Sequence, residues 1–167
     1  GEHGDGIVRS EFHEMMFGKK IINAFEEIKD IFDNKNLLNP GKIVRPYKSN
    51  DRSLMRYKSG YQANKITTHY DWSNWGQFSD AVEMCNNNGA CRKLDSGVMC
   101  PSYRVTKEEK DLVRGRANTL RLALSNQLPE GSFASKDMYE TMELCVSCKA
   151  CQRECPMSVD MAKMKSE

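Results

Sequence analysis

Long apolar runs and an excess of charge of one sign are both missing from this 167-residue sequence. No apolar stretch approaches the ~20 residues that a membrane-spanning helix needs, and no signal peptide is visible. Lys and Arg number 25 against 23 Asp and Glu, which gives a formal net charge of +2 without a long basic run. The sequence therefore predicts no transmembrane segment and offers no electrostatic case for nucleic-acid binding.

Hydrophobic residues are scarce too, at 39%, whereas 29% of the residues are charged. A chain of this length and composition forms one ordinary or two small domains with a modest core. Small domains are only marginally stable unless cross-links or bound metals stabilise them. Seven cysteines are present, an odd number. We therefore expect a cytoplasmic protein, in which cysteines bind metals or carry out redox chemistry instead of forming disulfides.

Helical periodicity is visible in both halves of the sequence, and no stretch alternates in the manner of a strand. A first amphipathic helix is predicted from apolar residues that recur on one face, namely Ile21, Phe25, Ile28 and Phe32. Asparagines and the turn at residues 39–41 end it. Residues 45–74 lack periodicity and have the composition of a linker, in which aromatic residues could wrap along a surface.

From residue 76 onward the pattern is all-helical. The best-marked helix is predicted over 107–126, because Thr106 and Glu109 have the spacing of a capping box. Shorter helices are predicted near 77–85, over 135–144 and over 159–165.

Four cysteines near the carboxyl end form the pattern C-x2-C-x2-C-x3-C-P, at Cys145, Cys148, Cys151 and Cys155. Three thiolates at this spacing wrap around one cuboidal iron–sulfur cluster, and the fourth, before a proline, typically binds the other cluster of a two-cluster protein. A zinc site is the alternative, but zinc usually takes two C-x2-C pairs separated by a longer loop. The spacing therefore favours iron and sulfide.

A second group of cysteines follows the same pattern with two differences. Cys85 corresponds to the first cysteine of the motif and Cys91 to the third, but Asn88 stands at the second position. Cys100 precedes Pro101, as the terminal cysteine of the motif precedes its proline, after a longer insertion.

If the last cysteine of each group, Cys100 or Cys155, binds the cluster of the other group, two ligand sets result. Four thiolates would hold a [4Fe–4S] cluster, from Cys145, Cys148, Cys151 and Cys100. Three would hold a [3Fe–4S] cluster, or a [4Fe–4S] cluster with one other ligand, from Cys85, Cys91 and Cys155. We prefer this grouping to the unexchanged one, in which Cys100 stays with Cys85 and Cys91.

Three arginines, Arg114, Arg116 and Arg121, lie on the predicted helix between the cysteine groups. A positive charge near a cluster stabilises its reduced state and raises its potential. A solvated helix face is the simpler interpretation, and the sequence alone favours it.

The amino-terminal loop, residues 1–9, places Glu2 and His3 among glycines. A carboxylate beside an imidazole could bind a divalent metal or accept a proton, although an ordinary surface turn has the same appearance. Asp5 could form a local ion pair with Arg9. The two remaining histidines lack a partner at ligand spacing and are expected to be surface or packing residues.

Two stretches of sequence resemble known families. GEHGDGIVRSEF, the helix after it and FDNKNLLNPGKIV resemble the end of the carboxy-terminal domain of FAD-linked oxidases, which occurs in D-lactate, glycolate and D-2-hydroxyglutarate dehydrogenases. The segments CNNNGACRK, GVMCPSYRVTKEE, RGRAN and LCVSCKACQRECPMSVDMAK resemble the iron–sulfur extension of some bacterial members. A motif without its second cysteine is similar to that of succinate dehydrogenase iron–sulfur subunits, where it accompanies a three-iron cluster.

These resemblances imply a mainly α chain in three parts. Residues 1–47 would be the end of an α+β FAD-linked oxidase carboxy-terminal domain, residues 48–75 a linker, and residues 76–167 an α-helical, ferredoxin-like two-cluster domain. By the same resemblance, Glu2 would bind a divalent metal such as zinc together with upstream histidines. His3 would be the catalytic base or a substrate-binding residue.

The whole enzyme would then oxidise a D-2-hydroxy acid and pass electrons from FAD through two clusters. The acceptor would be a quinone, a cytochrome or another redox subunit, which leaves open a peripheral position at the inner face of the membrane. An upstream domain of the same polypeptide would hold most of the FAD, so we expect the 167 residues alone to be inactive. The alternative is a non-catalytic iron–sulfur subunit of a respiratory complex, which leaves GEHGDG unexplained.

Overall fold

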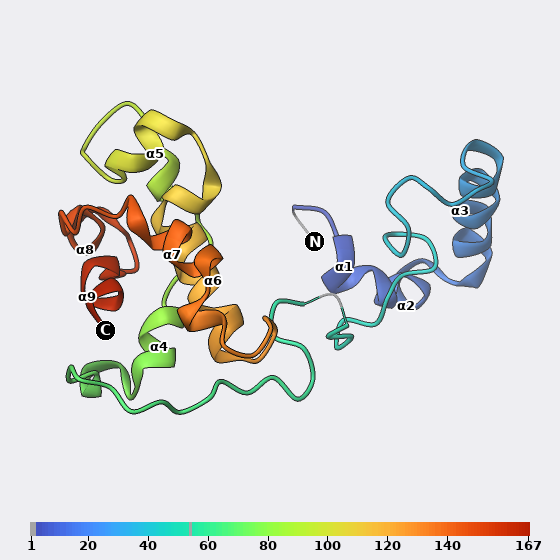
Figure 1. The fold of residues 1–167 in the computed structure, drawn as a ribbon. Helices are drawn as coiled ribbons and strands as arrows, with labels where there is room; N and C mark the ends of the chain where they lie inside the picture. The colour runs from blue at the N-terminus through green and yellow to red at the C-terminus, as the bar shows by residue number, and fades with distance from the viewer. Residues whose placement is uncertain (1–2, 54) are drawn as a thin grey trace. The chain divides into compact units, whose positions relative to one another are not determined.

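The computed structural model describes residues 3–53 and 55–167, and all regular secondary structure in this part of the chain is helical. The chain divides into two compact units, Gly1–Gly60 and Tyr61–Glu167 (Figure 1). The division falls inside the predicted linker, and the finer partition into three parts stays a prediction. Among the described helices, none has the length and apolar character needed to cross a membrane.

The first unit consists of short helical segments followed by one longer helix. They are α1 (Gly6–Arg9), the 3-10 turn η1 (Ser10–Phe12), α2 (His13–Phe17) and α3 (Lys19–Phe32). Gly18, with a φ of 78°, separates α2 from α3 in a conformation that favours glycine. α3 ends at Phe32 and is followed by Asp33, whose carboxylate accepts hydrogen bonds from the backbone N–H groups of Leu37 and Leu38. The predicted first helix is therefore confirmed.

Much of the apolar surface of the first unit is uncovered within the described residues. Ile31 and Phe32 of α3 are 76% and 83% exposed, and Met15 of α2 is 85% exposed. Exposed apolar side chains of this size, where they gather, mark sites of contact with another protein surface.

The second unit is built around α6 (Val113–Leu124), which packs against α4, α7 and α9 (Figure 1). The other α-helices are α4 (Phe78–Glu83), α5 (Pro101–Thr106), α7 (Lys136–Glu143), α8 (Ala150–Glu154) and α9 (Met161–Ser166). Single 3-10 turns are η2 (Ser73–Trp75), η3 (Ala90–Arg92), η4 (Glu109–Asp111) and η5 (Ser132–Ala134). The core includes Val82, Leu112, Ala117, Leu124 and Val159.

The three shorter predicted helices correspond to α4, α7 and α9. Ser135 caps α7 by accepting a hydrogen bond from the N–H of Met138. The helix predicted over 107–126 begins later, at Val113, so the capping-box interpretation was wrong. Pro101 starts a separate helix, α5, directly after Cys100. This helix ends at Thr106 and is followed by Lys107, which has a φ of 61°.

The segment 61–75 is packed onto the second unit. Trp72 is 3% exposed, and its Nε1 donates a hydrogen bond to Glu167 over 2.9 Å. The N–H of Asn64 donates to the carbonyl of Leu124 at the end of α6 over 2.8 Å. Aromatic residues thus hold part of the predicted linker against the helices, as the sequence had indicated.

Candidate functional site

Two loops of the second unit follow the same backbone course. Residues 85–91 connect α4 to the turn η3, and residues 145–151 connect α7 to α8. Positive φ values recur at corresponding positions, at Asn87 (65°) and Gly89 (79°) in the first loop and at Ser147 (51°) and Lys149 (60°) in the second. The correspondence between the two cysteine groups that the sequence predicted is therefore present in the backbone.

Asn88 and Cys148 occupy the corresponding position in the two loops. The Asn88 Oδ1 accepts a hydrogen bond from the N–H of Ala90 over 2.8 Å, and its Nδ2 donates to Asn86 over 2.6 Å. The amide is thus engaged in closing its own loop. Cys148, by contrast, presents an exposed thiol.

One small cavity of the second unit is lined by cysteines from two distant segments. Its cysteines are Cys100, Cys145, Cys148 and Cys151. None of the seven cysteines, all of which lie in the described part of the chain, forms a disulfide. Each thiolate of a cubane binds a different iron, so the ligands of one cluster must come together around a shared space. The four residues line this one cavity, and their role as ligands stays a prediction. They are the residues of the predicted four-thiolate set, and their donor chemistry fits an iron–sulfur cluster.

No single-ion site accompanies this cavity: among the described residues, no three or more His, Cys, Asp or Glu side chains gather so that they could hold a metal ion. Of the predicted three-thiolate set, Cys85 and Cys91 are buried and Cys155 is half-buried. The grouping of these three stays a prediction.

Backbone N–H groups point at two of the buried thiols. Burial raises the pKa of Cys151, whereas the N–H groups of Met161 and Ala162, in the first turn of α9, oppose that rise. Burial likewise raises the pKa of Cys91, and the N–H of Arg114 opposes it. Such N–H donors stabilise a thiolate and tune a cluster bound to it.

Comparison with known proteins agrees with this geometry. Residues 81–159 match the model of the 4Fe-4S dicluster domain, and residues 1–43 match that of the FAD linked oxidases, C-terminal domain. The chain thus joins an FAD-linked oxidase C-terminal segment to a 4Fe-4S dicluster domain.

The relatives that match nearly the whole chain share one name, whereas those that match only its amino-terminal part have other names. The chain is 31% identical to D-2-hydroxyglutarate dehydrogenase of Pantoea ananatis over 204 residues, which cover 99% of this chain and 19% of that protein. It is 28% identical to the protein of the same name from Escherichia coli (strain K12), again with 99% and 19% covered. Glycolate oxidase subunit GlcD of Bacillus subtilis is 44% identical over 43 residues, 26% of this chain and 9% of that protein.

The chain spans about a fifth of the length of the D-2-hydroxyglutarate dehydrogenases that it matches. No solved structure matches it.

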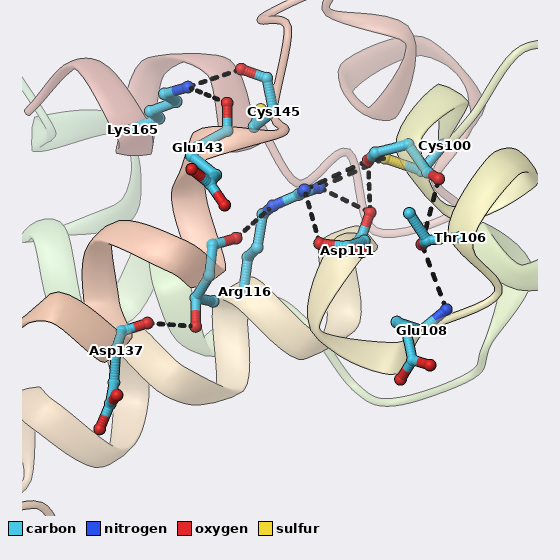
Figure 2. Close-up of polar contacts among 11 residues, drawn as sticks. Cys100, Thr106, Glu108, Asp111, Arg116, Asp137, Glu143, Cys145 and Lys165 are labelled. Carbon is cyan, nitrogen blue, oxygen red and sulfur yellow. Dashed lines mark hydrogen bonds and ion pairs between the residues drawn. The ribbon is translucent and has the colours of Figure 1, made fainter.

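In the dicluster domain, the first turn of α6 contacts one cysteine from each of the two predicted ligand sets. The N–H of Arg114 faces the thiol of Cys91, and Nη1 of Arg116 donates to Cys100 Sγ over 3.5 Å (Figure 2). Gly115 lies between them, where an added Cβ would stand 2.0 Å from the carbonyl oxygen of Glu109. Glycine is therefore needed for this turn to approach η4 closely.

The interpretation of the arginines as a solvated face was wrong for two of the three. Arg116 is fully buried and Arg121 is 7% exposed. Arg114 is more exposed, and its Nη2 lies 2.6 Å from the carboxylate of Glu109. The sequence could not reveal this difference, because nothing in the local sequence of a polar helix indicates whether one of its arginines is buried.

Glu154 links the segment before Cys155 to the segment before Cys100 by hydrogen bonds. It directly precedes Cys155, and its carboxylate accepts hydrogen bonds from the N–H groups of Val98 and Met99 over 2.9 and 3.1 Å. Because these N–H groups stabilise the anion, they lower the pKa of Glu154. The chain before Cys100 is thereby tied to the chain before Cys155, a connection that sequence reasoning missed.

Lys165 of α9 supports the loop that carries Cys145. Its Nζ donates to the carbonyl oxygens of Cys145 over 2.7 Å and of Glu143 over 3.4 Å (Figure 2). A cation at the end of α7 also complements the helix dipole.

In the amino-terminal segment, the predicted metal ligand Glu2 lies outside the described residues, and His3 is exposed. Asp5 pairs with His13 over 2.8 Å and holds no ion pair with Arg9, whose Nη1 donates instead to a backbone carbonyl. The hydrogen bond between His13 and Asp5 lowers the pKa of Asp5. His13 is 4% exposed, which agrees with the predicted packing role.

Proposed function

We propose that this chain relays electrons from a flavin to an acceptor as part of an FAD-dependent D-2-hydroxy-acid dehydrogenase. One observation carries the proposal: Cys100 lines the same cavity as Cys145, Cys148 and Cys151, although it belongs to the other cysteine group. An arrangement that shares a cysteine between groups is typical of two-cluster electron carriers. The match to the dicluster domain and the names of the relatives support the same activity.

The ligand sets follow from this arrangement. Cys100, Cys145, Cys148 and Cys151 would hold a [4Fe–4S] cluster. Cys85, Cys91 and Cys155 would hold a three-iron cluster, since Asn88 replaces the second cysteine and its amide is bonded within the loop. Bound clusters supply one-electron carriers, and the role of the protein is to hold them and adjust their potentials.

The amino-terminal segment would contribute one edge of the active site. His3 would accept the hydroxyl proton of the substrate, and Glu2 would be a ligand of a divalent metal such as zinc that polarises the substrate oxygens. FAD, held mainly by an upstream domain of the same polypeptide, would supply the hydride acceptor. The exposed apolar residues of α2 and α3 supply a surface against which such a domain would pack.

The substrate class is tested on the anaerobically purified full-length protein. We expect iron and sulfide on analysis, and reduction of both clusters, followed by EPR, when D-2-hydroxyglutarate is added. D-lactate and glycolate are the competing substrates, and L-2-hydroxyglutarate is the control. Zinc in place of iron would refute the relay. Loaded clusters that no 2-hydroxy acid reduces would favour the electron-transfer subunit.

A further inference from the structure

Arg116 lies within a buried polar cluster next to Cys100 (Figure 2). Beyond Cys100 Sγ, its guanidinium group has three hydrogen-bond acceptors and one ion-pair contact within the fold. Nε donates to the carbonyl of Thr141 over 2.9 Å, Nη1 to the carbonyl of Asp111 over 2.8 Å and Nη2 to Ser102 Oγ over 3.2 Å, while Asp111 Oδ1 lies 3.8 Å from Nη2. The planar fork is therefore held in one orientation.

We propose that the guanidinium group of Arg116 raises the reduction potential of the cluster held by Cys100, Cys145, Cys148 and Cys151, and that the carboxylate of Asp111 opposes it. This inference rests on the proposed function. A cluster gains one negative charge on reduction, so a fixed cation beside a ligand stabilises the reduced form. The N–H···S hydrogen bond acts in the same direction.

Burial strengthens the influence of both charges, that of Arg116 and that of Asp111, on the potential. The side chains of Arg116 and Asp111 are 0% and 1% exposed, so water and salt screen neither charge effectively. The two charges lie in one site with opposite signs, and their removal should therefore shift the potential in opposite directions. A purely structural role would not produce opposite shifts.

The test is an EPR-monitored redox titration of the anaerobically purified full-length protein and its variants. Arg116→Gln should lower the one-electron equilibrium constant of the four-iron cluster at least tenfold, about 59 mV for one electron. Asp111→Asn should raise it by a similar factor, and Arg116→Lys should restore part of the loss. Arg153→Gln is the matched control, because Arg153 is exposed and only two residues from Cys151, and its change should stay within threefold.

If the Arg116→Gln variant does not retain its clusters, a second measurement on wild-type protein tests the inference. In wild-type protein labelled with 15N-arginine, pulsed EPR of the reduced four-iron cluster should detect a 15N coupling that the Arg153→Gln variant retains. Absence of that coupling overturns the inference, as does an unchanged potential in both Arg116→Gln and Asp111→Asn. These results leave the relay itself intact, whereas wild-type protein without iron–sulfur clusters would refute the proposed function.

Discussion

Asn88 occupies, in the loop 85–91, the position that Cys148 occupies in the loop 145–151. Residues with positive φ stand at corresponding positions in the two loops. A cysteine at position 88 would therefore project from its loop as Cys148 projects from the other. The difference between the two predicted clusters is thereby reduced to one side chain.

Asn88→Cys should convert the second cluster. Wild-type protein should contain about seven irons per chain and give the EPR signal of an oxidised three-iron cluster, whereas the variant should bind about eight irons and lose that signal. Iron analysis with EPR of the oxidised protein measures both. Asn86→Ser, which changes a neighbouring asparagine without adding a thiol, is the control. An Asn88→Cys protein that keeps the three-iron signal would speak against the correspondence of the loops.

Gly115→Ala should destabilise the dicluster domain. The added methyl group would meet the carbonyl oxygen of Glu109, and backbone cannot move aside as a flexible side chain can. Overpacking of this kind costs about 1–3 kcal/mol. Chemical denaturation followed by cluster absorbance measures the loss, and Lys136→Ala, on the exposed side of α7, is the control. Equal stability of the two variants would show that α6 does not need this approach.

Glu154→Gln should loosen the segment before Cys100 without removing any thiol. The carboxylate accepts two backbone N–H bonds, and a neutral amide oxygen accepts them more weakly. Hydrogen exchange at Val98 and Met99 should therefore become at least tenfold faster. Glu143→Gln is the control, since its carboxylate lies outside this contact. Unchanged exchange would mean that Glu154 does not hold the segment.

Asp33 should give the first unit an acid-sensitive helix end. Lys29 and the N–H groups of Leu37 and Leu38 lower the pKa of Asp33 to about 2. Because the folded pKa lies below the ordinary value of 3.8, the stabilisation is complete above pH 3.8 and is lost as the pH falls toward 2. NMR titration of the Asp33 carboxyl carbon measures this directly. A midpoint near 3.8, like that of an exposed aspartate, would contradict the capping role.

Local pattern predicted the helices that carry their own signals. α3 has a one-sided apolar stripe and α7 has Ser135 as a cap, so both were found close to their observed bounds. The start of α6 was missed because Thr106 and Glu109 have capping-box spacing by coincidence. The observed course depends on Pro101, which starts a separate helix, and on the burial of Asp111, which is a tertiary effect.

The cysteines of the candidate site could be predicted because cluster chemistry imposes their spacing on the sequence. The groups around them could not. Arg116 and Glu154 act through partners that lie far away along the chain, and an arginine or a glutamate on a helix is exposed in most proteins. Trp72 likewise joined the core from a segment without any periodicity.

The most direct test of the account is EPR of Cys100→Ala and Cys155→Ala proteins, each purified anaerobically and examined both oxidised and reduced. We predict that Cys100→Ala loses the signal of the reduced four-iron cluster and keeps the oxidised three-iron signal, and that Cys155→Ala does the reverse. If Cys100→Ala instead abolishes the three-iron signal and spares the four-iron cluster, then Cys100 belongs with Cys85 and Cys91, and the shared cavity does not define a cluster.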